Sequence, residues 1–170
     1  MKKALIVVDM QNDFIDGALG SIEAQGIVEK VREKIEGFDG EVVFTLDAHD
    51  EDYLGTQEGK KLPVSHCIKG TNGWEIHPRL KGFVKNQIEK PTFGAVNLPG
   101  FLFDLLGGEP EMLELVGLCT DICVISNAML LKAAFPETEI VVDSGCCAGV
   151  TPESHKTALD SMQAVQIEVL

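Results

Sequence analysis

Residues 114–125, ELVGLCTDICVI, decide the fold, because within a few positions they change from the pattern of a strand to that of a helix. The apolar run up to Cys119 is typical of a strand, and Thr120 or Asp121 is a suitable N-cap for a following helix. Cys123 would then lie in the first turn of that helix, and Cys119 in the strand end or the bend. In such an elbow, backbone N–H groups near Cys119 and Cys123 could form an oxyanion hole.

These two cysteines leave several interpretations open. The free N–H groups and the dipole of a helix start favour a thiolate, which predicts a lowered pKa and a nucleophilic role for Cys123. A buried, inert cysteine fits the spacing about as well. A redox pair is a third interpretation. A structural zinc site is disfavoured, because this C-x-x-x-C pattern lacks a second cysteine pair at finger-like spacing.

The rest of the chain alternates between similar apolar runs and segments with helical spacing. Continuous apolar runs predict strands that are buried on both faces, at residues 2–10, 41–50, 114–119 and 139–145, with further strands at 86–90 and 164–170. Helical spacing, with Ser or Thr caps, predicts helices at residues 21–38, 120–135 and 151–163. This alternation predicts an α/β fold, a doubly wound and mostly parallel sheet with helices on both faces in three layers.

Length and composition restrict the class of protein. The 170 residues, 45% of them hydrophobic, predict a single domain over residues 1–170. A net charge of −13 argues against nucleic acid and anionic membranes as partners. The apolar run near the N-terminus is interrupted by Asp9, well short of the roughly 20 residues of a membrane span, so we expect a cytoplasmic protein. The five cysteines, an odd number, predict reduced thiols.

Polar residues close several of the predicted strands. In open α/β sheets, ligands bind beyond the carboxyl ends of the strands, and the residues found there are Asp9, Asp47 with His49, Lys90, and the turn that carries Cys123. A carboxylate, an ammonium and a thiol at one edge would supply a general base, a positive charge and a nucleophile.

A second set of residues has the chemistry of a metal site. Asp47 and His49 lie two positions apart, and the long irregular segment that follows contributes His66. One carboxylate and two imidazoles suit a borderline metal ion. Glu58 in the same segment is either an additional ligand or a surface acid. Taken alone, the pattern also fits a loop cap and solvated histidines. Irregular segments of this length in compact domains are usually functional or disordered.

Five stretches together resemble the isochorismatase-like cysteine hydrolases, and within them the nicotinamidases. In chain order they are VVDMQNDF (7–14), TLDAH (45–49), LPVSHCIKGTNGWEIHP (62–78), IEKPTFGA (88–95) and GLCTDICV (117–124). They extend over nearly the whole chain, and their joint occurrence is specific although each alone is not.

The resemblance implies roles for the residues already singled out. Asp9, Lys90 and Cys123 would be the catalytic triad, while Asp47, His49 and His66 would bind a divalent metal, typically zinc. Glu58 falls where some nicotinamidases have a fourth ligand. The resemblance also implies a cis peptide between Leu118 and Cys119, and a homo-oligomer.

The implied reaction is hydrolysis of a small amide, nicotinamide, to nicotinate and ammonia through a thioester on Cys123. Asp9 would take and return the proton, Lys90 would hold both groups in their charged states, and the metal would grip the pyridine nitrogen. Phe14 and Trp74 are predicted to be apolar walls of the pocket.

The sequence departs from the family pattern after the lysine. Many members have a small hydroxylated residue followed by Ala and Phe, where this chain has Gly94, Ala95 and Val96. This departure leaves open a metal-free carbamoyl or ureido hydrolase with the same triad. Two alternatives of another class are a thiol redox sensor, which would use Cys119 and Cys123 or Cys146 and Cys147, and a binding protein on the same fold. Cys123 argues against an isochorismatase, which lacks the cysteine.

Overall fold

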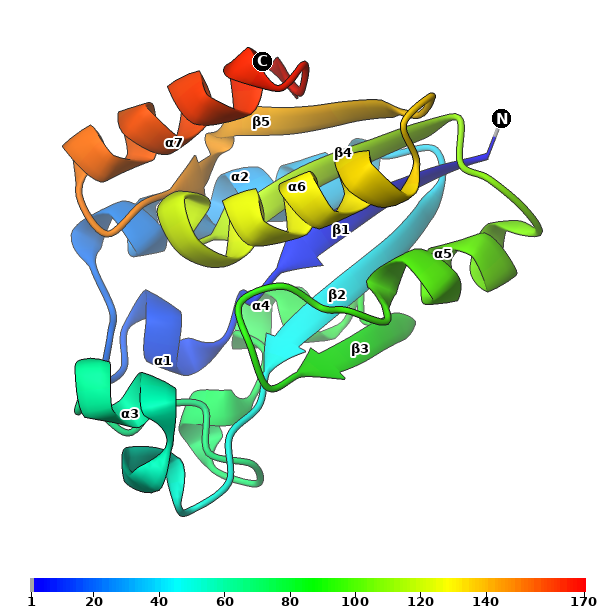
Figure 1. Cartoon of the computed structure of the whole chain (residues 1–170). Helices are drawn as coiled ribbons and strands as arrows, with labels where there is room; N and C mark the ends of the chain where they lie inside the picture. Colours follow the sequence, from blue (N-terminus) through cyan, green and yellow to red (C-terminus); the bar gives the residue numbers. More distant parts are fainter. Residues whose placement is uncertain (1) are drawn as a thin grey trace.

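A six-stranded sheet forms the centre of the computed structural model, which describes residues 2–170 (Figure 1). The strands are β1 (Lys3–Val8), β2 (Glu41–Asp47), β3 (Asn86–Lys90), β4 (Met112–Leu118), β5 (Glu139–Ala148) and β6 (Glu168–Val169). The helices are α1 (Asn12–Ile15), α2 (Ile22–Gly37), α3 (Gln57–Lys61), α4 (Pro78–Lys81), α5 (Leu98–Leu106), α6 (Ile125–Ala134) and α7 (Pro152–Ala164). Two 3₁₀ turns (Tyr53–Gly55 and Asn72–Trp74) and a π-helical turn (Thr120–Val124) complete the described elements.

The strand order is β3-β2-β1-β4-β5-β6, and each neighbouring pair is parallel. The chain therefore moves outward from β1 to β3 on one side, then returns to the centre and moves outward from β4 to β6. This arrangement confirms the predicted doubly wound sheet. Its order reverses between β1 and β4, and ligands of such sheets bind in the crevice beyond the strand ends at that reversal.

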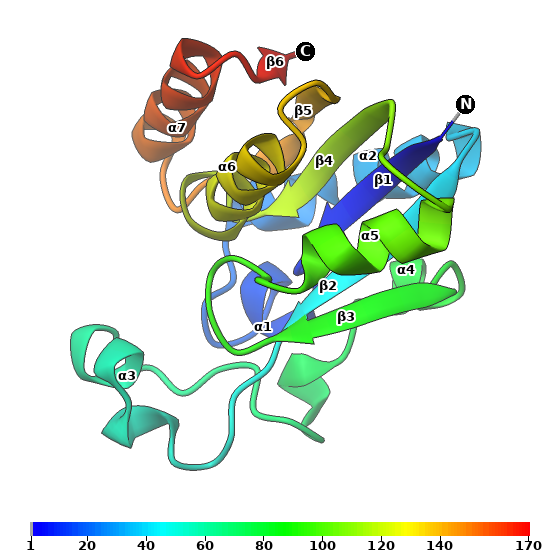
Figure 2. The same ribbon diagram turned by 45° about the vertical axis from the view of Figure 1, so that its right-hand side comes forward.

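Helices cover both faces of the sheet and create two hydrophobic cores (Figure 2). Side chains alternate along β1, so Ala4, Ile6 and Val8 pack in one core and Leu5 and Val7 in the other. The first core includes residues of α5, α6 and α7, and the second includes residues of α1, α2 and α4. Burial on both faces explains why the strands are apolar without alternation.

The sequence predicted most of these elements. The helix after Ser21 and the helix after Thr151 begin as expected, because both side chains accept a hydrogen bond from a backbone N–H of the first helical turn. The predicted strand at 164–170 is reduced to two residues of β6. Helix α5 was missed. The long segment between Ala48 and Pro78 is ordered and contains α3 and both 3₁₀ turns.

Close contact between the two central strands depends on Gly117. Its φ of +114° is disfavoured for other residues, and a Cβ there would lie 2.2 Å from the carbonyl oxygen of Val8. The β4–β5 register also shifts between Leu115 and Gly117. Glycine thus lets the end of β4 pass next to the end of β1, which brings the residues after the two strands together.

Within residues 2–170, no helix is long and apolar enough to cross a membrane.

Candidate active site

Asp9, Lys90 and Cys123 meet at the carboxyl edge of the sheet, although they are far apart in the sequence. The ammonium Nζ of Lys90 lies 2.7 Å from Oδ2 of Asp9 and 3.3 Å from Sγ of Cys123. Each residue is at most 5% exposed. Asp9 follows β1, Lys90 ends β3, and Cys123 lies in the π-helical turn after β4. The structure therefore brings together the three residues that the sequence predicted to converge.

The backbone and a neighbouring hydroxyl fix the carboxylate of Asp9. Its φ is +47°, a left-handed conformation that Asp tolerates better than most residues. The Thr45 hydroxyl donates a 2.6 Å hydrogen bond to Oδ1, and the Asp9 N–H donates to the Thr45 carbonyl. Oδ2 remains the oxygen that faces Lys90. Sequence reasoning missed Thr45, although it lies within the TLDAH stretch.

Electrostatics at this triad differ from the prediction. Burial raises the pKa of Cys123 well above its usual value, and the negative charge of Asp9 adds to this effect while Lys90 opposes it. The predicted lowering of the Cys123 pKa by the helix start is therefore wrong. Burial also raises the pKa of Asp9, with partial compensation by Lys90. For Lys90, burial opposes the charged form, but the nearby carboxylates outweigh it and raise its pKa.

The turn that carries Cys123 begins one residue earlier than expected. Cys119, not Thr120 or Asp121, is the N-cap, and it makes no side-chain capping hydrogen bond. The hydroxyl of Thr120 instead lies 2.7 Å from Nδ1 of His155, and Asp121 accepts from the N–H of Val150. These polar side chains fasten the turn to α7 and to the segment before it. Cys123 lies in the first turn, as predicted, and the Leu118–Cys119 peptide is cis, as expected.

Four residues next to the triad form what we call the ligand group: Asp47, His49, Glu58 and His66. One ligand atom from each lies within 4.8 Å of all the others. Nε2 of His49 and Nε2 of His66 lie 2.9 and 3.4 Å from Oδ2 of Asp47. The same two nitrogens lie 3.7 and 3.8 Å from Oε1 of Glu58. Glu58 is therefore part of the cluster, rather than only a surface acid.

Hydrogen bonds behind the ligand group orient its members. Nδ1 of His66 lies 2.7 Å from the Val64 carbonyl, an arrangement in which Nδ1 donates and Nε2 faces the other ligands. The side chain of Gln11 accepts from the Asp47 N–H and donates to the Asp47 carbonyl, both at 2.8 Å. Asp13 accepts from the N–H of Cys67, beside His66. Sequence reasoning missed Gln11 and Asp13, which lie in the VVDMQNDF stretch.

The donor set fits a divalent cation such as zinc. Two imidazole nitrogens and two carboxylate oxygens are ligands that zinc accepts; Asp47, His49 and His66 are buried and Glu58 is partly exposed. Burial raises the pKa of Glu58, and the charge of Asp47 raises it further. A cation between the two carboxylates would relieve this repulsion. Lys90 already contacts the other oxygen of Asp47, at 3.4 Å, which connects the ligand group to the triad.

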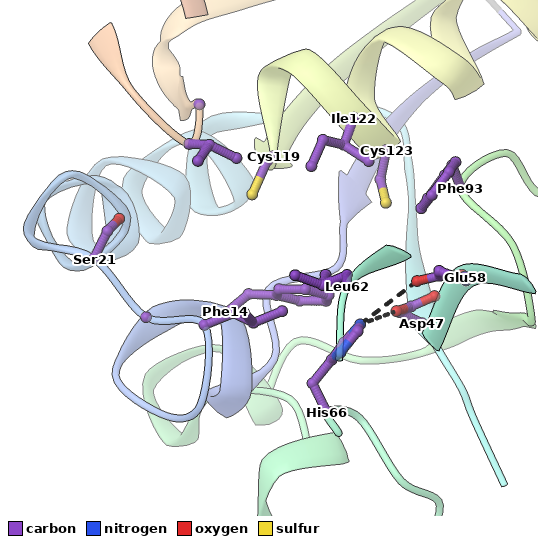
Figure 3. A pocket seen from close by; sticks show the side chains of 14 residues that line it. Phe14, Ser21, Asp47, Glu58, Leu62, His66, Phe93, Cys119, Ile122 and Cys123 are labelled. Carbon is purple, nitrogen blue, oxygen red and sulfur yellow. Dashed lines mark ion pairs between the residues drawn. The ribbon is translucent and has the colours of Figure 1, made fainter. Parts of the chain in front are cut away.

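One cavity of about 390 Å³ lies between Cys123 and three members of the ligand group. Cys123 and Cys119 line one side of it, and Asp47, Glu58 and His66 line another (Figure 3). The remaining lining residues are Phe14, Leu19, Gly20, Ser21, Leu62, Phe93, Ile122, Gly149 and Val150. The cavity is therefore mostly apolar, with the thiol and the carboxylates as its reactive groups. Leu62 and Phe93 are walls that sequence reasoning missed.

The two predicted aromatic walls have different positions. Phe14 lines the cavity, and its ring centroid lies 5.4 Å from that of His66. Trp74 does not line it, so that part of the prediction is wrong. The 3₁₀ turn at Asn72–Trp74 directs the indole to a separate surface depression beside Leu46 and Val84. Only the carbonyl of Trp74 approaches the site, as an acceptor for Gln11.

Chemically, this cavity can hold a small molecule between the thiol of Cys123 and the ligand group. The thiol has an adjacent carboxylate that can accept its proton, and a lysine that compensates the charge. The ligand group lies on the other side and suits a Lewis acid. Amide hydrolysis by covalent catalysis needs the nucleophile, the proton acceptor and the compensating charge close together, and the ligand group adds a second binding position.

A family model described as the isochorismatase domain matches residues 3–170. The nicotinamidase/pyrazinamidase of Mycobacterium tuberculosis is 28% identical over 188 residues, which cover 99% of this chain and 98% of that protein.

Solved structures show the same similarity over the whole chain. The crystal structure of nicotinamidase PncA from Bacillus subtilis has a TM-score of 0.83 and 31% identity, and 99% of each chain is covered. A pyrazinamidase of Pyrococcus horikoshii in complex with zinc has a TM-score of 0.83 and 26% identity, covering 100% of this chain and 99% of that one.

Proposed function

The chain belongs to the isochorismatase family, and on that premise we propose that it is a nicotinamidase that hydrolyses nicotinamide to nicotinate and ammonia. The observation that carries this proposal is the single cavity shared by Cys123 and the ligand group. A nucleophile alone would suit many amides, whereas a metal site across the pocket suits an amide whose ring offers a nitrogen ligand.

In the first half of the reaction, Cys123 attacks the carboxamide carbon and forms a carbon–sulfur bond. Its thiol proton passes to Asp9, whose Oδ2 is buried and faces the reaction centre. Because burial keeps the resting Cys123 protonated, this transfer accompanies the attack instead of preceding it. Asp9 then gives the proton to the amide nitrogen, the carbon–nitrogen bond breaks, and ammonia leaves.

In the second half, water attacks the thioester and Asp9 takes a proton from it. The carbon–sulfur bond breaks and the proton on Asp9 returns to the sulfur of Cys123. Nicotinic acid is released and gives its remaining proton to water, which yields nicotinate. Lys90 stabilises negative charge on either partner during both halves, since its ammonium lies within 3.3 Å of both. The backbone N–H groups of Cys119 and Cys123, at the start of the helix, are the proposed oxyanion donors.

A zinc ion held by Asp47, His49, Glu58 and His66 would supply a Lewis-acidic position for the pyridine nitrogen. The chain's own residues provide the rest of the substrate site. Phe14 and Phe93 offer apolar contact to the ring, and both line the cavity. Asp47 is also 3.4 Å from Lys90, so the metal-side and thiol-side groups share one charge network.

The proposal also includes a single domain, a homo-oligomer, a cytoplasmic location and small-molecule partners. The single domain over residues 1–170 is supported by one sheet with two cores. The homo-oligomer and the cytoplasmic location remain predictions. The net charge of −13 supports the absence of nucleic acid and anionic membranes among the partners.

The alternatives fit the site less well. A metal-free carbamoyl or ureido hydrolase would leave the two carboxylates and two imidazoles of the ligand group without a role. A redox sensor needs reactive thiolates, but burial raises the pKa of Cys119 to about 12. A binding protein would not need a proton acceptor beside the thiol.

Ammonia release by the purified, zinc-supplemented protein tests the proposal. The substrates are nicotinamide, pyrazinamide, carbamoylsarcosine and ureidoacrylate, with Cys123→Ala as the blank. We expect the first two amides to be hydrolysed and the last two to be poor. Preferential release from the carbamoyl or ureido compound would overturn the assignment to nicotinamide.

A further inference from the structure

The chain between β3 and α5 passes beside the active site, and its backbone makes few hydrogen bonds. Residues 91–95, which we call the 91–95 loop, directly follow Lys90, and Phe93 of this loop lines the cavity although its side chain is 46% exposed (Figure 3). Within residues 2–170, no backbone–backbone hydrogen bond joins residues 91–94 to the rest of the chain. Side chains must therefore hold the loop in place.

Two side chains from outside the loop supply the hydrogen bonds that hold it. Nζ of Lys90 donates to the Thr92 carbonyl at 3.1 Å. Asn127, on α6, contributes the others: its Nδ2 donates to the Phe93 carbonyl at 3.2 Å, and its Oδ1 accepts from the Ala95 N–H at 2.8 Å. Asn127 is fully buried. A buried amide in a helix interior normally needs such partners, because an unsatisfied one is costly.

The same amide also contacts the nucleophile's turn. Nδ2 of Asn127 donates to the Cys123 carbonyl at 2.8 Å, one helical turn earlier. One side chain therefore bonds to the residue that carries the thiol and to the loop whose carbonyl holds the ammonium of Lys90. A Cβ added at Gly94 would lie 3.6 Å from the Ser126 carbonyl oxygen, so the loop passes close to this helix.

We propose that Asn127 is a positioning residue. It fastens the 91–95 loop to the helix that follows Cys123, and thereby fixes the positions of the Lys90 ammonium and of the Phe93 side chain at the cavity. Without it, Lys90 would be the main remaining polar anchor of the loop. The ammonium would then have to hold a mobile loop and serve the triad with the same hydrogens. Loss of the anchor lowers kcat through Lys90 and raises KM through Phe93. The kinetic part of this inference rests on the proposed amidase function, whereas the structural part does not.

Asn127→Thr separates the two contacts of the amide, which are the bond to the Cys123 carbonyl and the bonds to the loop. A threonine hydroxyl in a helix bonds to the carbonyl four residues earlier, so this variant keeps a partner for Cys123 but cannot reach the loop. Asn127→Ala removes all of the bonds. Ser126→Ala is the matched control, because it deletes a hydroxyl from the neighbouring position that bonds only to the Ile122 carbonyl of its own turn.

Limited proteolysis with chymotrypsin reports on the loop without any need for activity. The protease cuts after Phe, and Phe93 lies in the loop. In Asn127→Thr we expect cleavage after Phe93 to be roughly 10- to 30-fold faster than in the wild type, since two hydrogen bonds no longer oppose opening. Mass spectrometry should identify fragments 1–93 and 94–170, with other sites and Ser126→Ala unchanged.

Kinetics of the zinc-loaded protein with nicotinamide complete the test. Asn127→Thr should lose roughly 10- to 100-fold in kcat/KM, the scale of a small misplacement of catalytic groups, with kcat lowered and KM raised. Ser126→Ala should match the wild type. If Asn127→Thr were cleaved after Phe93 at the wild-type rate, Asn127 would not hold the loop. Cleavage that became equally faster at all sites along the chain would also refute this role. If cleavage after Phe93 were faster but kcat and KM for nicotinamide were unchanged, Asn127 would hold the loop without influencing the reaction. A wild type that releases no ammonia would refute only the proposed function, because the proteolysis still decides whether Asn127 holds the loop.

Discussion

The ammonium of Lys90 lies 2.7 Å from Oδ2 of Asp9, and both side chains are withdrawn completely from solvent. Charges this deeply buried are tolerated only when they compensate each other, so the pair is a requirement of the site as well as part of its chemistry. Cys123 lies next to this pair without being ionised itself, because burial keeps its proton on the sulfur. The site therefore combines a buried carboxylate–ammonium contact with a thiol whose pKa is raised.

Lys90→Met should damage both stability and turnover. The substitution leaves the carboxylate of Asp9 buried without its counter-charge, which costs about 3–5 kcal/mol unless Asp9 takes up a proton. A protonated Asp9 cannot accept the thiol proton, so turnover should become barely measurable. Denaturant unfolding and ammonia release measure the two effects. Lys69→Met is the control, because Lys69 forms an exposed ion pair with Glu89 and should change neither.

Asp9→Asn should lower turnover by roughly 10²- to 10⁴-fold, the usual scale for loss of a general base. The asparagine keeps the size of the side chain and can still bond to Thr45. KM should change little, since Asp9 is not among the residues that line the cavity. Steady-state kinetics with nicotinamide measure this. Near-normal turnover would refute the role of Asp9 as proton acceptor.

The alkylation rate of Cys123 should increase with pH up to higher values than the rate of a low-pKa thiolate at a helix start, which would already be constant at neutral pH. Because burial and Asp9 raise its pKa above the usual 9.0, the rate with iodoacetamide should still rise above pH 9 in the metal-free protein. The protonated folded thiol also stabilises the fold, and this contribution should be lost as pH rises above about 9, where the unfolded thiol ionises.

Asp9→Asn supplies the internal comparison for that titration. It removes the negative charge that raises the Cys123 pKa and leaves Lys90 as the nearest charge, so the pKa should fall. The variant should therefore be alkylated faster than the wild type at neutral pH, although it turns over more slowly. A plateau below pH 7 in the wild type would contradict the protonated resting thiol.

Removal of the metal should affect binding more than bond cleavage. If the ion grips the ring nitrogen, the chelated protein should keep its fold and an alkylatable Cys123 but show a strongly raised KM for nicotinamide. His49→Ala and His66→Ala should each lose bound zinc, whereas His77→Ala, a histidine outside the ligand group, should retain it. Metal analysis, circular dichroism and kinetics after add-back test this.

Benzamide should be a poor substrate with or without zinc, because it has no ring nitrogen. Nicotinamide turnover that is indifferent to chelation would contradict the metal's role and favour a carbamoyl or ureido hydrolase.

Much of this arrangement could be predicted from the sequence because parallel strands carry two local signals. Their buried interiors are continuously apolar, and their polar end residues must meet at one edge, which is why Asp9, Asp47 and Lys90 could be grouped. Helix α5 was missed because Pro99 and Gly100, at its start, are typical of loops; in the structure, Pro99 occupies the first helical turn, where it is tolerated.

The remaining errors concern properties that depend on the folded environment. The pKa of Cys123 is raised by burial and by Asp9, more than 100 residues earlier in the chain, and neither influence is visible in the local sequence of the helix start. Trp74 lies between His66 and Lys90 in the sequence, but the short turn that carries it points the indole elsewhere. Asn127 resembles any polar helix residue until the 91–95 loop is seen to pack on it.

Substitution of the two cysteines should separate the nucleophile from its neighbour. Cys123→Ala should abolish turnover, because no other thiol contacts Lys90 within residues 2–170. Cys119→Ala should retain most of it, since a backbone N–H is all that Cys119 is proposed to contribute. Ammonia release measures both variants. Equal loss from both substitutions would indicate a redox or metal pair instead.

Mass spectrometry of the acid-quenched reaction with nicotinamide tests the central claim most directly. We predict a nicotinoyl adduct on the peptide that contains Cys123, formed within the first turnover by the zinc-loaded wild type and absent from Cys123→Ala. A protein that releases ammonia from nicotinamide without this adduct, or with the adduct on Cys119, would contradict the proposed thioester mechanism.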